Sequence, residues 1–348
     1  MKKMASLLLV GLVLCCGGCA GMRTAMDTGQ SRILYVAADE KAHHQLFVVA
    51  LEEGDTEQLT REPFGVWDYA VSPDGDRIAY AALRRDGGSD LWMVESDGRG
   101  RHQLLACQEA DCIEPDWSPD GARIAYTRRD NVLDLPRIWW LDVVTGETEP
   151  FFQDDQEVGF GARWSPDGQW LSYVSRPDSG VRVYNVDDGR SRLIPGRAEV
   201  PAVWSPQGDG LLVADVQFRG ESFVIHLLRA DLENEQLTDL SGDLEVEDGS
   251  PAWSPDGAWI AFNRKPPRVS MGKQLGLMRP DGSEVHFLTN DVEVHHGVPA
   301  WSPDGRYLLF QRYPLSEPDA RPGIWLLEIE TGTLREVVMP GSRPAWLP

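Results

Sequence analysis

The chain has 348 residues, and 55 Asp and Glu against 33 Lys and Arg give it a formal net charge of −22 at pH 7. This acidic excess makes the chain a poor partner for nucleic acid or anionic lipid headgroups and suits cationic partners or divalent metals, although solubility alone also accounts for it. The 34 glycines, 24 prolines and 13 tryptophans indicate many short strands joined by tight turns.

The first residues of the chain have the pattern of an export signal. Lys2 and Lys3 precede an apolar stretch, residues 6–14, that is too short to span a bilayer stably. Gly17-Gly18-Cys19 then resembles the processing site of bacterial lipoproteins, where small residues precede the Cys that is lipidated. We therefore expect residues 1–18 to be a cleaved signal peptide of the lipoprotein type.

This resemblance implies that Cys19 becomes the lipid-bearing N-terminus. Residues 19–30 are then a tether that reaches at most about 35 Å. Ala20, in place of an Asp, implies sorting to the outer membrane, facing the periplasm, in a Gram-negative cell. An ordinary cleaved signal that releases a soluble protein is the alternative. Residues 31–348 remain for a single domain.

One five-residue pattern occurs six times in that domain, at intervals of 40 to 49 residues. Its Pro presets φ, its Ser and Asp oxygens bond nearby amides and its Gly accepts positive φ, so the pattern predicts a hairpin turn. The interval is typical of the blades of a β-propeller. The six copies are Val71-Ser72-Pro73-Asp74-Gly75, Trp117-Ser118-Pro119-Asp120-Gly121, Trp164-Ser165-Pro166-Asp167-Gly168, Trp204-Ser205-Pro206-Gln207-Gly208, Trp253-Ser254-Pro255-Asp256-Gly257 and Trp301-Ser302-Pro303-Asp304-Gly305.

A short apolar strand follows most of these turns, with an aromatic residue at the same offset, as in residues 77–80 and 123–126. A third strand comes next, as in 91–94, and many third strands lead through a second Gly turn to a short fourth strand such as 236–238. No long stretch has a helical period. The domain is therefore predicted to be all-β, in four-stranded units.

The two ends of the domain complement each other. Residues 31–60 contain the second, third and fourth strands of a unit whose first strand is missing. Pro344-Ala345-Trp346 repeats Pro251-Ala252-Trp253 and stops where the turn should follow. We therefore expect a composite blade from both termini, which closes the ring and hides its edges. With six internal units, the prediction is a seven-bladed β-propeller.

The repeated Trp-Ser-Pro-Asp-Gly turn and its apolar strand resemble the WD40-like repeat of the TolB family, also called PD40. The resemblance extends from Ser31 to Trp346. It implies a propeller related to TolB, a periplasmic protein that has an α/β domain ahead of six blades and binds a peptidoglycan-associated lipoprotein across one propeller face. This chain differs by its short segment before the first strand, its seven predicted blades and its own predicted anchor. The resemblance therefore implies a TolB-like propeller lipoprotein rather than TolB itself.

Two cysteines remain after the predicted signal and anchor, Cys107 and Cys112. Export places them in an oxidising compartment, and the four residues between them permit a small closed loop. We predict a disulfide between them. Metal ligation and a redox pair are the alternatives, and both lack their usual spacing and partners.

The two faces of a propeller carry different connections. The Ser-Pro-Asp-Gly turns lie on one face, and the loops between blades lie on the other. Both chain ends fall on the first face, so the tether should turn that face toward the membrane. The opposite, outward face is predicted to present partner-binding acids: Glu245, Glu247, Asp248, Asp291 and Glu293. The repeated turn residues are assigned to structure, because chemistry needs an asymmetric constellation.

Two histidine pairs fall on the outward face in neighbouring blades: His43-His44 and His295-His296. With nearby carboxylates, these imidazoles suit a divalent metal such as Zn, Mn or Ni. Exposed polar loops carry such residues routinely, and the sequence does not show whether the four side chains converge. A divalent metal stays an alternative, and no other cofactor is predicted.

The sequence contains no catalytic motif, neither a Gly-x-Ser-x-Gly elbow nor residues for an α/β-hydrolase domain. We therefore expect a monomeric, non-enzymatic scaffold of the cell envelope that presents an acidic loop face to a protein or peptidoglycan-associated partner. The alternatives are a metal-dependent lyase or glycosidase built on the histidine pairs and a purely structural lipoprotein.

Overall fold

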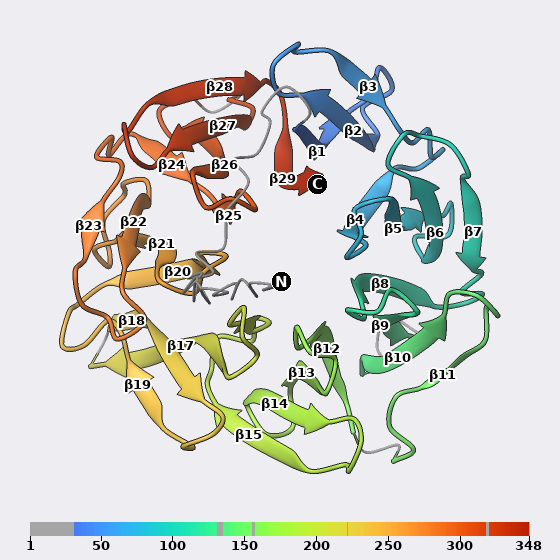
Figure 1. Ribbon diagram of the computed structural model, residues 1–348, viewed down its shortest axis with the longest axis horizontal. Coiled ribbons are helices and arrows are strands. Elements are labelled where there is room, and N and C mark those ends of the chain that lie inside the picture. The colour runs from blue at the N-terminus through green and yellow to red at the C-terminus, as the bar shows by residue number, and fades with distance from the viewer. Residues whose placement is uncertain (1–30, 131–134, 155–156, 221, 318–319, 348) are drawn as a thin grey trace, which may run out of the picture.

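The computed structural model describes residues 31–130, 135–154, 157–220, 222–317 and 320–347. Within these ranges every regular element is a β-strand, and the strands form a ring of small sheets (Figure 1). The prediction of an all-β propeller is confirmed. The predicted signal peptide, Cys19 and the tether lie outside the described residues. No helix in the described ranges is long and apolar enough to cross a membrane.

The strand pairings divide the ring into seven units, which we number as blades in chain order from the composite one. Each blade has four principal strands, ordered below from the inside outward. Blade 1 consists of β29 (Ser342–Leu347), β1 (Arg32–Ala38), β2 (His44–Ala50) and β3 (Thr56–Gln58), and blade 2 of β4 (Val66–Val71), β5 (Arg77–Leu83), β6 (Ser89–Glu95) and β7 (His102–Leu105). Blade 3 consists of β8 (Asp111–Trp117), β9 (Arg123–Arg129), β10 (Arg137–Asp142) and β11 (Thr148–Pro150), and blade 4 of β12 (Gly159–Trp164), β13 (Trp170–Ser175), β14 (Gly180–Asn185) and β15 (Ser191–Pro195).

The remaining three blades follow the same order, with the inner strand of the last one split in two. Blade 5 consists of β16 (Val203–Trp204), β17 (Gly210–Arg219), β18 (Ser222–Asp231) and β19 (Leu237–Asp239). Blade 6 consists of β20 (Glu247–Trp253), β21 (Ile260–Lys265), β22 (Gln274–Met278) and β23 (His286–Phe287). Blade 7 consists of β24 (Val294–His296) with β25 (Ala300–Trp301), then β26 (Tyr307–Pro314), β27 (Gly323–Glu328) and β28 (Leu334–Val338). Single parallel pairs, Ser89 with Asp111 and Ile225 with Glu247, join two neighbouring blades into eight-stranded sheets.

The repeated turns are held by their own side chains, as the turn of blade 3 shows. The Ser118 hydroxyl donates to the Asp120 carboxylate at 2.6 Å and accepts the backbone N–H of Arg123 at 2.9 Å. Gly121 supplies the positive φ, 67°, that the turn requires. In blade 5, where Gln207 replaces the Asp, the Ser205 hydroxyl donates instead to Asp209 at 2.5 Å. The turn residues therefore stabilise the fold locally.

Six of the seven blades have a tryptophan at or near the end of the inner strand, and blade 2 has Val71 at this position. In four of them the indole Nε1–H donates to a carbonyl on the inner strand of the preceding blade. These contacts are Trp117 to Ala70 at 3.2 Å, Trp204 to Arg163 at 3.0 Å, Trp301 to Ala252 at 3.0 Å and Trp346 to Ala300 at 3.2 Å. In these four blades the Trp therefore serves as a blade-to-blade contact, whereas Nε1 of Trp164 and of Trp253 has no hydrogen-bond partner among the described residues.

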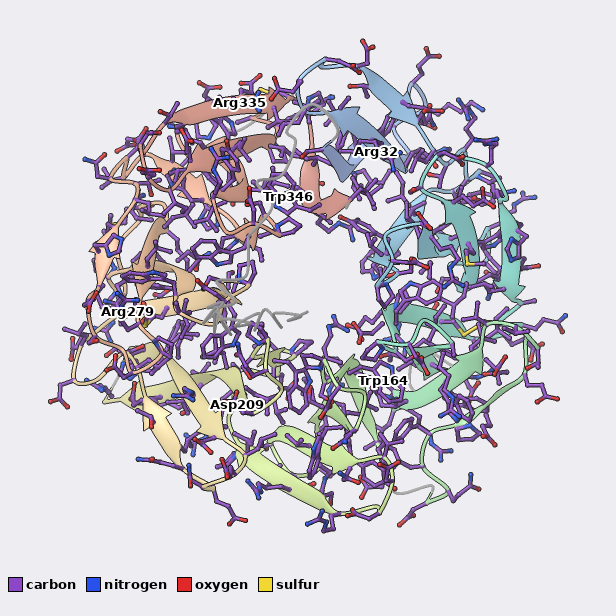
Figure 2. The ribbon with its side chains drawn as sticks, in the orientation of Figure 1. Arg32, Trp164, Asp209, Arg279, Arg335 and Trp346 are labelled. Atoms are coloured by element: carbon purple, nitrogen blue, oxygen red, sulfur yellow. A yellow bond between two sulfur atoms is a disulfide. The ribbon has the colours of Figure 1, made fainter. Side chains whose placement is uncertain are left out.

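The composite blade closes the ring through contacts on both of its sides. In β29 and β1, Arg32 pairs with Leu347 and Ile33 with Trp346. Arg335 Nη1 donates to the Leu51 carbonyl at 3.3 Å, which ties blade 1 to blade 7. On the other side Arg32 Nη1 donates to a carbonyl of blade 2 at 3.0 Å. Figure 2 labels Arg32, Arg335 and Trp346 around this blade. Both termini of the described chain thus belong to one blade.

The hydrophobic core lies between neighbouring blades rather than in one central cluster. Leu34 and Val48 of blade 1, for example, pack with Ile78 and Tyr80 of blade 2. The aromatic residues at one offset in the second strands are fully buried: Tyr80, Tyr126, Tyr173, Phe262 and Phe310. The disulfide between Cys107 and Cys112 is present, and it closes the loop between β7 and β8.

Candidate functional site

The exposed apolar side chains gather at one end of the ring. We call the inter-blade face the end formed by the loops between blades and by the loops from second to third strands, and the turn face the opposite end. Of the 17 large hydrophobic side chains exposed among the described residues, 12 lie in the loops of the inter-blade face, at the tip of one of its hairpins, or on the stretches of inner strand that follow these loops: Phe64, Trp67, Leu135, Val200, Phe218, Phe223, Leu244, Val269, Val292, Val298, Leu315 and Met339. The others lie at the turn face, like Val144, or on the outermost strands.

The longest hairpin of the described chain contributes two of these side chains. β17 and β18 have ten residues each, against five to eight in the equivalent strands of the other blades. Phe218 and Phe223 face each other across the hairpin near its tip, with 68% and 46% of their surface exposed. The cross-strand pair stabilises the hairpin itself. Two exposed aromatic rings at a hairpin tip also give a partner a place to anchor.

Two of the five predicted partner-binding acids are not on the surface. The Asp248 carboxylate is fully buried, with Arg264 Nε and Nη2 at 2.5 and 2.6 Å and the Ser241 hydroxyl at 2.6 Å. Glu247 is also buried, and its carboxylate lies 3.1 Å from Lys265 Nζ. Contrary to expectation, Glu247 and Asp248 are unavailable to a partner, because their carboxylates hold blade 6 together.

The other three predicted acids are exposed. Glu245 lies in the loop between β19 and β20, and Glu293 in the loop between β23 and β24. Asp291 lies in the same loop as Glu293, with its carboxylate 3.3 Å from Arg312 Nη2. Exposed ion pairs of this kind contribute little to stability. Glu245, Asp291 and Glu293 therefore remain on the inter-blade face as groups that a cationic partner can reach.

The four histidines do not form the metal site that the alternative hypothesis requires. No group of three or more His, Cys, Asp or Glu side chains in the described ranges is arranged to hold a metal ion. His296 is buried, its Nδ1 lies 3.0 Å from the Lys273 carbonyl oxygen, and burial lowers its pKa to about 4. His295 packs against the Tyr313 ring at 5.0 Å. His43 and His44 lie at the hairpin between β1 and β2.

The inner strands of blades 2 to 4 carry an ionic cluster of Asp68, Asp116 and Arg163. None of these residues was among the site residues predicted from the sequence. Asp68 accepts the backbone N–H of Glu114 at 2.6 Å, and Asp116 accepts that of Trp164 at 2.8 Å. Arg163 lies 3.9 Å from Asp116. Burial raises the pKa of both Asp68 and Asp116 to about 6. These two acids, whose pKa values are raised to about 6, clamp one inner strand to the next.

A signal for this cluster exists in the repeat itself. The residue two positions before the turn serine is Ala70, Val203, Ala252 or Ala300 in four of the copies. The remaining two copies have Asp116 and Arg163 at this position, and the structure places these two side chains next to each other. The departures from the repeat, rather than the repeat, mark the asymmetric part of the ring.

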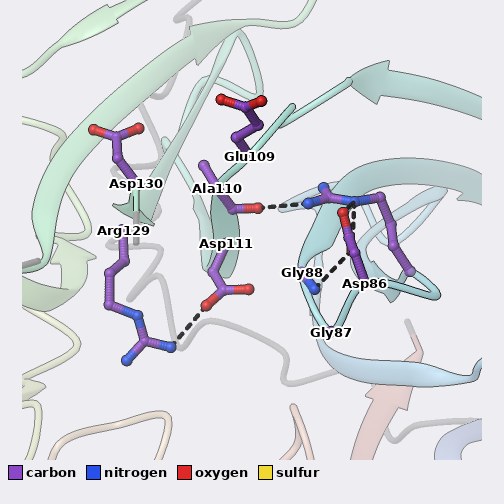
Figure 3. A pocket seen from close by; sticks show the side chains of 9 residues that line it. Asp86, Gly87, Gly88, Glu109, Ala110, Asp111, Arg129 and Asp130 are labelled. Atoms are coloured by element: carbon purple, nitrogen blue, oxygen red, sulfur yellow. Dashed lines mark hydrogen bonds and ion pairs between the residues drawn. The ribbon is translucent and has the colours of Figure 1, made fainter. Parts of the chain in front are cut away.

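A polar pocket of about 370 Å³ opens between blades 2 and 3 on the inter-blade face (Figure 3). Its lining includes Arg84, Glu109, Asp111 and Arg129. Arg84 already donates to the Cys107 and Ala110 carbonyls at 2.7 and 3.0 Å, and Arg129 lies 2.7 Å from Asp111. The lining arginines therefore hold the disulfide loop in place, and the pocket is mainly a structural joint between two blades.

Comparison with known proteins agrees with this architecture. The profile of the TolB beta propeller domain family (PD40) matches residues 21–283. The chain belongs to the TolB beta propeller family. Among solved structures, this family member is similar to TolB from Acinetobacter baumannii, with a TM-score of 0.55, 17% identity, and coverage of 91% of this chain and 82% of that one. A likeness at this level of identity describes the fold alone.

Curated relatives of this propeller include proteins of different activities. It is 37% identical over 73 residues to the Tol-Pal system protein TolB of Hahella chejuensis, which covers 20% of this chain and 16% of the relative. It is 27% identical over 192 residues to the uncharacterized peptidase YuxL of Bacillus subtilis, which covers 43% of this chain and 29% of the relative. The chain thus spans less than a third of the length of either relative.

Proposed function

We propose that this protein is a non-enzymatic binding protein of the cell envelope, which presents its inter-blade face to a protein or peptidoglycan-associated partner. The observation that carries the proposal is the concentration of exposed apolar side chains on that face, 12 of 17 among the described residues. Monomeric proteins seldom leave apolar patches exposed without a use, and such patches mark interaction surfaces. A family that contains a Tol-Pal system protein supports the envelope setting.

The charge of the chain defines the partner further. The net charge of −22 favours a partner whose contact surface is cationic around its apolar anchors. Glu245, Asp291 and Glu293 on the inter-blade face supply exposed carboxylates for that contact. Phe218 and Phe223 supply aromatic anchors. Apolar anchors determine most of the affinity in such interfaces, and the surrounding charges mainly raise the association rate.

The lipid anchor is a separate part of the proposal. Cys19 carries the lipid and holds the protein on the outer membrane, with the turn face toward the membrane and the inter-blade face toward the periplasm. Cys19→Ala then releases the protein into the soluble periplasmic fraction. Unchanged membrane retention of the variant, measured by fractionation, contradicts the anchor and leaves the proposed binding function open to its own test.

The binding function is tested by a pair of matched surface variants. Phe218→Ser combined with Phe223→Ser removes both aromatic rings from the inter-blade face, and Val144→Ser removes an exposed apolar side chain from the turn face. Affinity pull-down after in vivo crosslinking should recover an envelope partner with the wild type and with Val144→Ser, and at least tenfold less with the double variant. Equal recovery by all three proteins contradicts the proposal.

The metal-dependent enzyme hypothesis receives no comparable support. It depends on the two histidine pairs, and His296 is buried with its Nδ1 already bonded to a backbone carbonyl. Of the carboxylates on the same face, Glu247 and Asp248 are committed to Lys265 and Arg264, and Asp291 lies 3.3 Å from Arg312 Nη2. Elemental analysis of the purified protein tests this alternative directly, and near-stoichiometric metal that is lost on His295→Ala would revive it.

A further inference from the structure

Blade 5 differs from the other blades in how far its inner strand accompanies the second strand. In the other six blades this pairing continues to within two residues of the end of the second strand. In blade 5, β16 pairs only with Leu211 and Leu212, so residues 213–219 of β17 have no strand on this side. The long hairpin of β17 and β18 therefore has an open inner edge on the inter-blade face.

The backbone groups of Val216 and Phe218 are directed toward this open edge. On the other strand of the hairpin, the Ile225 N–H donates to the Val246 carbonyl at 2.9 Å and so points away from β17. Two residues that face each other in an antiparallel pair exchange both of their hydrogen bonds or neither. Val216 is the register partner of Ile225, so its N–H and C=O point away from β18, and those of Phe218, two residues further on, do the same.

The loop that precedes β16 covers only the beginning of this edge. A Cβ on Gly196 would lie 3.6 Å from the Ala214 carbonyl oxygen, so the loop passes beside Ala214. The next N–H of the loop, from Arg197, donates to the Asp215 carboxylate at 3.0 Å rather than to the backbone of β17. Residues 216–218 thus extend past the loop.

Beyond Asp215 the edge is unpaired and accessible. Among the described residues, the backbone groups of Val216 and Phe218 have no hydrogen-bond partner. Val216 is half-buried, and Phe218 has 68% of its surface exposed. Free N–H and C=O groups along a strand edge are a template for another strand. The edge therefore has both the hydrogen-bonding groups and the access that an extended chain needs.

We propose that this edge receives an extended segment of the partner protein as an added strand, which pairs with the backbone of Val216 and Phe218. Main-chain hydrogen bonds provide the affinity in this mode of binding, and the neighbouring side chains select the sequence. Phe218 selects an apolar residue in the segment. Arg197 selects an acidic one, because its guanidinium lies 6.0 Å from the Phe218 ring and has no carboxylate within ion-pair distance among the described residues. The inference rests on the proposed function, since the segment belongs to the partner of the inter-blade face.

Amide hydrogen exchange of the purified protein, followed by NMR, tests the open edge without any partner. The N–H groups of Asp215 and Gln217 bond β18, whereas those of Val216 and Phe218 face solvent. We expect the Val216 and Phe218 amides to exchange at least tenfold faster than the Asp215 and Gln217 amides. Equal protection of all four amides overturns the proposal.

Two proline variants test the pairing with the partner. Val216→Pro removes an N–H from the open edge and none that holds β17 to β18. Leu193→Pro is the matched control on β15, the outermost strand of blade 4. There the Asn185 N–H donates to the Arg190 carbonyl at 2.8 Å, and in this register the Leu193 N–H points away from β14. Both variants therefore remove an edge N–H, but only Val216→Pro does so at the proposed site.

In the pull-down after crosslinking, Leu193→Pro should recover the partner as the wild type does, and Val216→Pro at least tenfold less. In the complex isolated with the wild type, exchange of the Val216 and Phe218 amides should be at least tenfold slower than in the free protein, and this measurement decides if Val216→Pro fails to fold.

Equal recovery by the two proline variants, or unchanged exchange in the complex, overturns the added strand. A partner that is lost with the Phe218 and Phe223 double variant and kept with Val216→Pro leaves the proposed function standing and overturns only this inference. A wild type that captures no partner overturns both. Capture of a second copy of this chain through the same edge overturns the assignment to a partner protein.

Discussion

The inner-strand acid Asp116 allows a sharp test of how the ring is held together. Asp116 accepts the backbone N–H of Trp164 at 2.8 Å, and burial raises its pKa to about 6 despite the nearby Arg163. Asp116→Asn keeps a carbonyl oxygen for the Trp164 N–H and removes the buried charge. The variant should therefore be more stable than the wild type at pH 8 and not at pH 4.

The magnitude follows from proton linkage. A carboxyl group whose pKa rises from 3.8 unfolded to about 6 folded contributes its stability below pH 3.8, and loses it as the pH rises through 6. About two pKa units correspond to roughly 3 kcal/mol at most. The Asp116 side chain keeps 24% of its surface exposed. Solvent screening therefore reduces the expected gain of Asp116→Asn at pH 8 to about 1–3 kcal/mol.

Urea unfolding at a series of pH values between 4 and 8 measures this gain. Asp120→Asn is the matched control, because Asp120 lies four residues away in the turn of the same blade. Hydrogen bonds from Ser118 and then Ala122 lower the pKa of Asp120, so its charge stabilises the fold at neutral pH and the effect fades as the pH falls. The two variants should shift stability in opposite directions at pH 8. An Asp116→Asn variant that is equally destabilised at pH 4 and pH 8 refutes the reasoning.

Three further contacts are tested by substitution in the same urea assay. The double variant Cys107→Ala with Cys112→Ala should have a free energy of unfolding about 2 kcal/mol lower than that of the wild type. A reductant should lower the free energy of unfolding of the wild type by the same amount and leave that of the variant unchanged. Glu62→Ala should lower the free energy of unfolding by about 3 kcal/mol, because the buried Glu62 carboxylate accepts from the Tyr80 hydroxyl and from Arg101 Nε, each at 2.8 Å. A decrease below about 0.5 kcal/mol would contradict a stabilising role of Glu62. Asp209→Ala should lower the free energy of unfolding by about 1 kcal/mol and Gln207→Ala by less than half of that, because Asp209 accepts the Ser205 hydroxyl in this turn. The reverse order would contradict the replacement of the usual turn Asp by Asp209.

The fold was predictable from the sequence because its determinants are local and repeated. Ser118, Asp120 and Gly121 make their turn almost by themselves, and the same turn recurs along the chain. The closure by β29 was predictable from the incomplete Pro344-Ala345-Trp346 repeat. The hydrogen bond from Trp117 to the preceding blade was not predictable, because a sequence does not show which carbonyl lies opposite an indole N–H.

The site was less predictable because burial depends on contacts between strands. Glu247 and Asp248 look like loop acids in the sequence, and only the register of β20 against β21 places them beside Lys265 and Arg264. The apolar surface was missed for the opposite reason. Single exposed residues such as Phe64 or Val292 are unremarkable in sequence, and they form a pattern only when the loops gather on one face.

Site-specific photocrosslinking in intact cells decides whether the inter-blade face is the partner-binding surface. The photoreactive residue is placed at Phe218 on the inter-blade face or at Val144 on the turn face. Both positions are well exposed, at 68% and 90% of their surface. We expect a discrete crosslinked partner from position 218 and none from position 144. A partner captured from position 144, with none from position 218, would show that the protein binds through its turn face instead.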